Sequence, residues 1–134
     1  MNFVEFTGTG HLNVRGVHKT TLEFTKSANL RPEGDCVIVV NADFDATKIK
    51  HLAHECNKIR ITICAGLLSE SVEAITNKRF DADDELVIRI GEFDSARTLG
   101  IRANKAALHL LRDLIEKLKD PQQKVVIKIE EVKD

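Results

Sequence analysis

The sequence predicts an α+β fold in which a mostly antiparallel or mixed β-sheet carries two α-helices, with closure of the sheet into a barrel as one alternative. Segments of alternating apolar and polar residues outnumber segments with a helical stripe. Neighbouring strands are often joined by turns too short for a parallel crossover. A chain of 134 residues, 43% hydrophobic and 31% charged, can bury one core. We therefore expect a single domain over residues 1–134.

Two strands open the chain. Val4 and Phe6 alternate with polar neighbours, and the alternation returns over residues 18–26. Because residues two apart share one face of a strand, Leu22 and Phe24 should point inward. At the edge of the core, the same inward row should continue with His18 and Thr20. The opposite face is expected to be exposed and holds Lys19, Thr21, Glu23 and Thr25.

The middle of the chain combines a buried strand with a helix. Residues 36–40 are apolar on both faces, which is typical of a central strand. Over residues 46–57 an amphipathic stripe predicts a helix with Asp45 as its N-cap; the stripe consists of Ile49, Leu52, Ala53 and Cys56. Further strands are expected at 59–64, 72–76, 86–90 and, as a short extended piece, 98–102.

A second helix is predicted over residues 104–118, with Asn104 as its N-cap. Its apolar stripe consists of Ala107, Leu111, Leu114 and Leu118. Pro121 prevents the helix from continuing. Alternating residues over 125–129 then predict a last strand.

Composition excludes several classes of protein. The longest aliphatic run, residues 37–40, is far below the roughly 18 residues that a membrane helix needs, and the start of the chain lacks the pattern of a secretory signal. We expect a cytoplasmic protein without a membrane partner. Three cysteines without C-x-x-C spacing indicate reduced thiols. A net charge of −1 and the absence of Trp and Tyr disfavour a broad nucleic-acid surface, although small basic clusters leave RNA open.

Four motifs resemble the mainly archaeal domain-of-unknown-function family DUF371. Together they cover most of the chain; they are Gly10-His11-x-Asn13-Val14, His18-Lys19-Thr20-Thr21-x-Glu23-x-Thr25-Lys26, Gly34-Asp35-Cys36 and Arg97-Thr98-Leu99-x-Ile101-Arg102-Ala103-x-Lys105-Ala106-Ala107. The resemblance implies one domain that holds all four motifs. The family supplies no established reaction, so the resemblance implies no mechanism.

Three familiar ligand motifs do not fit. A P-loop needs glycine where this chain has His18, and an EF-hand needs glycine where it has Leu86. On the first helix, the histidines at 51 and 54 lie opposite the apolar stripe that contains the cysteine at 56. A metal pair of His11 and His18 would need a third ligand such as Asp35 or Glu23. We predict no metal site, and the sequence names no cofactor.

The leading hypothesis is a polar pocket that binds a small anionic metabolite through phosphate or carboxylate. The candidate proton carriers are His11 and His18, because imidazole titrates near neutral pH. Arg102 and Lys105 would hold the anion. The other candidate ligand-binding residues are Asn13, Lys19, Thr20, Glu23, Asp35, Arg97 and Thr98. The pocket requires the amino-terminal segment and the 97–105 segment to meet.

Other interpretations stay open. The cations of the 97–105 segment could form internal salt bridges with Glu23, Asp35 or Asp43. The chain could instead be a non-catalytic module that binds RNA or protein through the exposed row beside Glu23 or through the last helix. In a third reading, the polar motifs only stabilise the fold, and a homo-oligomer buries the remaining apolar surface. No catalytic constellation is legible, so the sequence leaves open whether this is an enzyme.

Overall fold

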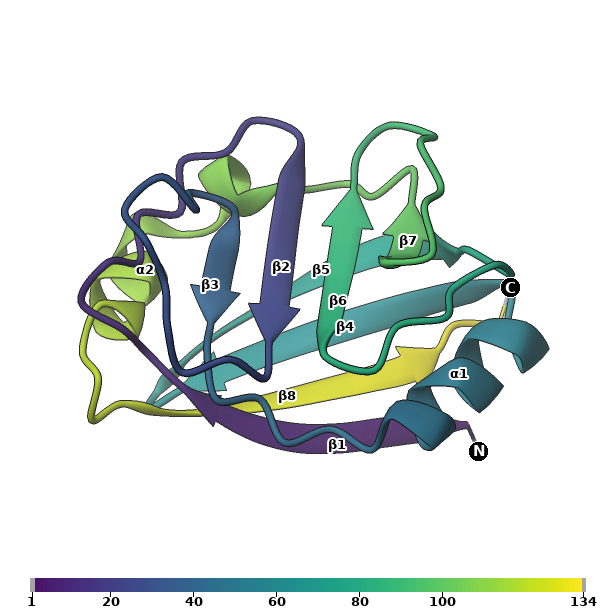
Figure 1. Ribbon diagram of the computed structural model, residues 1–134, viewed down its shortest axis with the longest axis horizontal. Coiled ribbons are helices and arrows are strands. Elements are labelled where there is room, and N and C mark those ends of the chain that lie inside the picture. The colour runs from purple at the N-terminus through teal and green to yellow at the C-terminus, as the bar shows by residue number, and fades with distance from the viewer. Residues whose placement is uncertain (1, 134) are drawn as a thin grey trace.

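The strands form one continuous mixed sheet in the order β1-β8-β4-β5-β7-β6-β2-β3 (Figure 1). The computed structural model describes residues 2–133. Its strands are β1 (Phe3–Thr9), β2 (Thr21–Thr25), β3 (Val37–Val39), β4 (Lys58–Ala65), β5 (Leu68–Thr76), β6 (Glu85–Arg89), β7 (Thr98–Ile101) and β8 (Lys124–Glu131). Its helices are α1 (Ala46–Glu55), the short 3₁₀ turn η1 (Ala107–His109) and α2 (Arg112–Leu118). The prediction of an α+β fold with a mixed sheet and two α-helices is confirmed.

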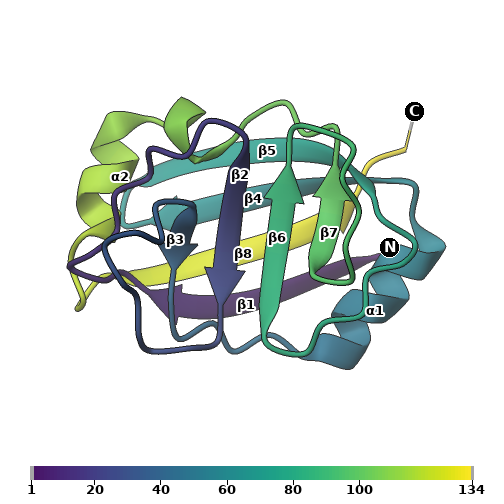
Figure 2. The same ribbon diagram turned by 45° about the horizontal axis from the view of Figure 1, so that its top comes forward.

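The sheet folds over on itself into two layers. The long strands β1, β8, β4 and β5 form one layer, and β2, β3, β6 and β7 cross in front of it (Figures 1 and 2). Strands β2 and β3 are parallel, as are β6 and β7, while the other neighbours are antiparallel. The core lies between the layers and includes the inward rows of both, among them Leu22, Phe24, Ile61 and Ile127.

The sheet is not closed into a barrel, so that alternative is wrong. Its two edge strands, β1 and β3, approach each other at one end only, where an isolated bridge joins Thr9 to Val40. Beyond that bridge, Asp43 donates its backbone N–H to the Thr7 carbonyl, and the Asp43 carboxylate accepts the Thr7 N–H at 2.7 Å. The amino-terminal half of β1 therefore remains an edge.

Helix α1 forms where the amphipathic stripe predicts it. The Asp45 carboxylate accepts the Lys48 N–H at 3.2 Å and caps the helix, which confirms the predicted N-cap. Ile49, Leu52 and Ala53 are buried, so the helix covers one end of the core. It ends at Glu55, two residues before the predicted end.

The predicted helix over residues 104–118 is wrong in its first half. Asn104 does not cap a helix: its N–H donates to the Glu73 carbonyl, and its side-chain oxygen accepts the Glu73 N–H. The chain therefore extends along β5 before the short turn η1, and α2 starts only at Arg112. Pairing with β5 satisfies the backbone groups that a helix would have used.

The row opposite the core on β2 is also not exposed. Thr21, Glu23 and Thr25 are all buried, and only Lys19, which precedes the strand, faces solvent. Arg97 reaches across to Glu23, and the Cys36 thiol lies against the same carboxylate. These three side chains therefore do not form the exposed row that the sequence predicted, and contact with RNA or a protein partner stays a prediction.

Candidate functional site

The segment 10–18 runs antiparallel along α2 (Figure 1). His11 donates its backbone N–H to the Leu118 carbonyl at the end of α2, and the His18 carbonyl accepts the Leu108 N–H before α2 begins. Between them, Arg112 donates to the Gly16 carbonyl at 2.9 Å. The two candidate proton carriers therefore lie at opposite ends of α2 and do not form one site.

Both imidazoles hold local turns through Nδ1. His11 Nδ1 accepts the Asn13 N–H at 2.9 Å, and His18 Nδ1 accepts the N–H groups of Thr20 and Thr21 at 3.2 and 3.1 Å. Each turn requires an Nδ1 lone pair, so the ring proton of the neutral imidazole is assigned to Nε2. Their predicted catalytic role stays a prediction.

The remaining candidate residues near the amino terminus make separate local contacts and do not converge on one ligand site. Asn13 donates its side-chain amide to the Leu30 carbonyl at 2.7 Å. The Asp35 carbonyl accepts the backbone N–H groups of Val17 and His18. Lys19 and Thr20 are exposed at the turn that leads into β2.

Glu23 and Arg97 do meet, on the outer face of the β2–β6–β7 layer. Arg97 contacts the Glu23 carboxylate at 3.4 Å and the Glu85 carboxylate at 2.5 Å. Burial, followed by the hydrogen bond and charge of Glu85, raises the pKa of Glu23 to about 7 against the lowering effect of Arg97. Burial and the Glu23 charge likewise raise the pKa of the Cys36 thiol to about 11. The Arg97–Glu23 contact is one of the internal salt bridges that the sequence left open for the cations of residues 97–105.

Thr98 belongs to the same outer face. It is buried on β7, and its hydroxyl oxygen accepts the Arg89 Nε–H at 2.9 Å and lies 3.1 Å from the Ser95 hydroxyl. The network binds loop 90–97 to the sheet.

Lys105 is half-buried, and two oxygens hold its ammonium group. Its Nζ contacts the Glu70 carboxylate and the Ser71 carbonyl, both at 3.0 Å. The other Glu70 oxygen accepts the Leu111 N–H at 2.7 Å, immediately before α2. Lys105 therefore anchors the turn into α2, and the helix N-terminus expected beside it is absent.

Arg102 is placed differently from Lys105. It has a left-handed backbone (φ 51°), an uncommon conformation for a residue other than glycine. Its guanidinium contacts Glu92 at 2.5 Å, but the side chains of Arg102 and Glu92 are 63% and 69% exposed. Exposed ion pairs contribute little to stability, so this contact leaves the guanidinium able to exchange partners.

A hollow of about 340 Å³ lies beside the short pairing of β5 with β7. We name it the Arg102 cleft; its lining consists of Lys58, Glu73, Ala74, Ile75, Arg102 and Asn104. Lys58 and Arg60 both pair with Glu73, and the Arg60 hydrogen bonds hold the pKa of that carboxyl below its ordinary value. Cationic groups therefore outnumber carboxylates around the cleft.

Sequence reasoning missed Lys58, Glu73 and Asn104 as members of this cleft. The periodicity of residues 72–76 indicated a strand but not its partner, and Asn104 carried the signal of a helix cap. The register that aligns Ile75 with Ile101 decides which side chains meet, and no local pattern encodes it.

Residues 6–132 match the domain-of-unknown-function family DUF371. The chain belongs to this family. An archaeal relative, the uncharacterized protein MJ0206 of Methanocaldococcus jannaschii, is 33% identical over 120 residues, which are 85% of this chain and 89% of the relative. The match confirms the resemblance carried by the sequence motifs.

In this DUF371 domain, residues 2–133 contain no group of three or more His, Cys, Asp or Glu side chains that could hold a metal ion. His51 and His54 are exposed on α1, whereas Cys56 is buried, as the helical spacing predicts. Within the same residues, every helix is too short or too polar to cross a membrane.

Proposed function

We propose that the chain binds a small anion, through phosphate or carboxylate, in the Arg102 cleft. The observation that supports this most is the guanidinium of Arg102, which lines a concave site and, among residues 2–133, is paired with one exposed carboxylate, that of Glu92. Guanidinium groups bind both anions through charge-assisted, bidentate hydrogen bonds. The volume, about 340 Å³, is within the range of small-molecule sites.

The neighbouring groups suit the same ligand. The side-chain oxygen of Asn104 is engaged by the Glu73 N–H, which leaves its NH₂ group as a donor at the cleft. Lys58 contributes a second cation, 3.4 Å from Glu73. Because Arg60 also neutralises Glu73, an entering anion meets little repulsion from that carboxylate.

The proposal is restricted to binding. The lining includes no histidine, and Lys105 is engaged by Glu70 rather than by the cleft. The sequence predicted that Arg102 and Lys105 would hold the anion. In the proposed site the two cations are Arg102 and Lys58. We assign no proton transfer to this site.

An NMR titration with inorganic phosphate and, separately, acetate tests the proposal, with chloride at matched ionic strength as the reference. We expect the amides of residues 73–75 and 101–104 to shift. Arg102→Asn removes the guanidinium while asparagine still accepts a left-handed backbone. Since a hydrogen bond to a charged group contributes about 1.5–3 kcal/mol, this variant should bind at least about tenfold more weakly.

Arg79→Asn is the matched control. Arg79 is also an exposed arginine with an acidic partner, Asp94 at 3.8 Å, but it does not line the cleft. Its affinity for the anions should equal that of the parent chain. Equal affinity of the Arg102 variant, or shifts confined to another surface, would contradict the proposal.

A further inference from the structure

The backbone of β1 alternates between two hydrogen-bonding directions. The Asn2 carbonyl accepts the Glu131 N–H and Gly10 donates to the Gln123 carbonyl, so even-numbered residues of this segment bond toward β8. In an antiparallel pair, the residues between them turn their N–H and C=O groups to the other side. Thr7 and Thr9 do so, bonding to Asp43 and Val40.

The same alternation places the N–H and C=O groups of Phe3 and Glu5 on the free edge. Within residues 2–133, no backbone or side-chain group is hydrogen-bonded to them there. Two residues of β1 thus present the hydrogen-bonding pattern of an incomplete ladder. Such a template fits another extended backbone.

A groove runs beside this template. It has a volume of about 320 Å³ and lies between β1 and α1; its lining consists of Asn2, Phe3, Val4, Thr47, Lys48, His51, Leu52 and Glu55. Figures 1 and 2 show α1 beside the amino-terminal half of β1. The helix covers the end of the core but leaves the groove open along the strand.

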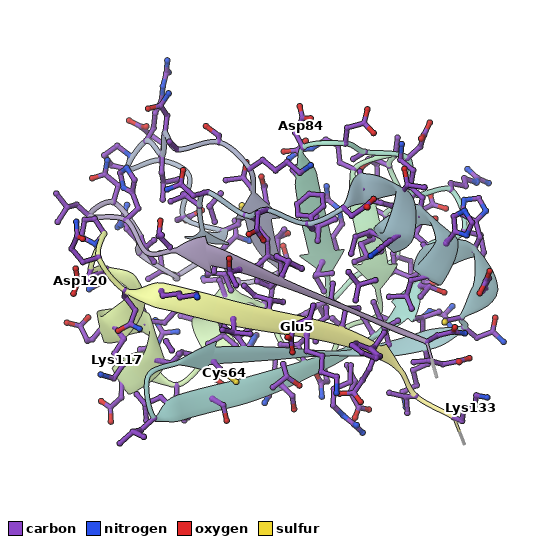
Figure 3. All side chains as sticks on the ribbon, turned by 90° about the horizontal axis from the view of Figure 1, so that it is seen from below. Glu5, Cys64, Asp84, Lys117, Asp120 and Lys133 are labelled. Carbon is purple, nitrogen blue, oxygen red and sulfur yellow. The ribbon has the colours of Figure 1, made fainter. Side chains whose placement is uncertain are left out.

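Side chains around the groove indicate the chemistry of its occupant. Phe3 is 50% exposed, with Lys128 Nζ 5.1 Å from its ring centroid, and the rest of the ring offers an apolar neighbour for a residue on an added strand. Glu5 lies on the outer face of the layer formed by β1, β8, β4 and β5, and Cys64 lies on that same face (Figure 3). Lys48, at the amino-terminal end of α1, has no ion-pair partner among the described residues and can receive a carboxylate, while Glu55, the acidic residue of the lining, faces His51 at 4.0 Å.

We propose that the β1–α1 groove is a docking site for an extended peptide segment of a partner protein, which adds a short strand to β1 at Phe3 and Glu5. Backbone hydrogen bonds would supply the common recognition, as in other strand additions. Specificity would come from an apolar residue beside Phe3 and an acidic residue near Lys48. This site is separate from the Arg102 cleft and does not depend on anion binding there.

Selection from a phage library of random dodecapeptides on the folded chain tests the proposal. Enriched peptides are synthesised and their affinities measured by fluorescence anisotropy. Glu5→Pro removes only an N–H that points away from β8, whereas Glu5→Thr retains it. We expect affinity to fall at least tenfold in the proline variant and less than twofold in the threonine variant. Lys48→Gln should weaken only those peptides, synthesised with amidated C-termini, that carry an Asp or Glu side chain.

A second measurement keeps the test valid if the proline variant does not fold. Alternate N–H groups of a bound strand point toward β1 and away from it. N-methylation of those that point toward β1 should abolish binding, and N-methylation of the others should leave it intact. Bound peptide should also slow hydrogen exchange of the Phe3 and Glu5 amides. A library without enriched peptides, helical peptides as the best binders, or binding unaffected by either modification would overturn the proposal.

Discussion

Replacing Glu23 with glutamine should stabilise the fold above neutral pH. The Glu23 side chain is only 9% exposed, and burial with the nearby Glu85 raises its pKa from 4.5 to about 7. The folded chain therefore holds a proton that the unfolded chain releases at a lower pH. For a carboxyl with a raised pKa, the stability contribution is greatest below pH 4.5 and is lost as pH rises through 7.

The magnitude follows from the size of the shift. A change from 4.5 to about 7, at 1.36 kcal/mol for each unit of pKa, corresponds to about 3 kcal/mol above pH 7. Glutamine resembles the protonated acid and avoids this cost. Arg97 keeps Glu85 as a partner at 2.5 Å, and the amide oxygen can still accept from the Cys36 thiol. The variant should therefore gain up to about 3 kcal/mol at pH 8 and little at pH 4.5.

Urea unfolding at pH 5, 6, 7 and 8 measures this difference as the free energy of unfolding in water. The gap between the variant and the parent chain in free energy of unfolding should widen from pH 5 to 7 and level off by about pH 8. Glu116→Gln, at an exposed position of α2, is the control and should shift stability by less than about 0.5 kcal/mol at every pH. A constant gap over this range, or a glutamine variant less stable at pH 8, would refute the reasoning.

Two further predictions concern the contacts of segment 10–18. His18→Ala should lower the free energy of unfolding by about 1 kcal/mol, because two partly solvated backbone N–H groups lose their acceptor, and His18→Asn should recover much of this since its side-chain oxygen replaces Nδ1. Gly10→Ala should cost about 1–3 kcal/mol, because its Cβ would overlap the carbonyls of Leu118 and Asp120. Thermal and urea unfolding measure both; a fully stable Gly10→Ala variant, or an asparagine variant no better than alanine at position 18, would contradict the respective argument.

The sequence was sufficient for the elements that bury a regular apolar row. The stripe of α1 and the alternation around Leu22 and Phe24 both predict the buried side chains found in the core. These patterns arise because one face of each element must leave water, a requirement that a single segment expresses by itself.

Where the partner was distant, the sequence was insufficient. Residues 104–111 carry helical periodicity, yet Asn104 pairs with Glu73, and Glu70 accepts the Leu111 N–H. Tertiary hydrogen bonds outweighed a weak local preference. The residues of the predicted anion pocket are separated for the same reason. Arg97 contacts Glu23 at one end of the 97–105 segment, whereas Arg102 lines a cleft with Lys58 at the other.

The pairing of β1 with β8 has a consequence for synthesis on the ribosome. These strands join residues 3–9 to residues 124–131, and β8 is inserted between β1 and β4. Until β8 has emerged, β1 and β4 each lack their hydrogen-bonding partner on the side where β8 will insert. Contacts between residues so far apart in the chain also form slowly. A nascent DUF371 chain must keep these bare edges away from other polypeptides until residues 124–131 have been synthesised.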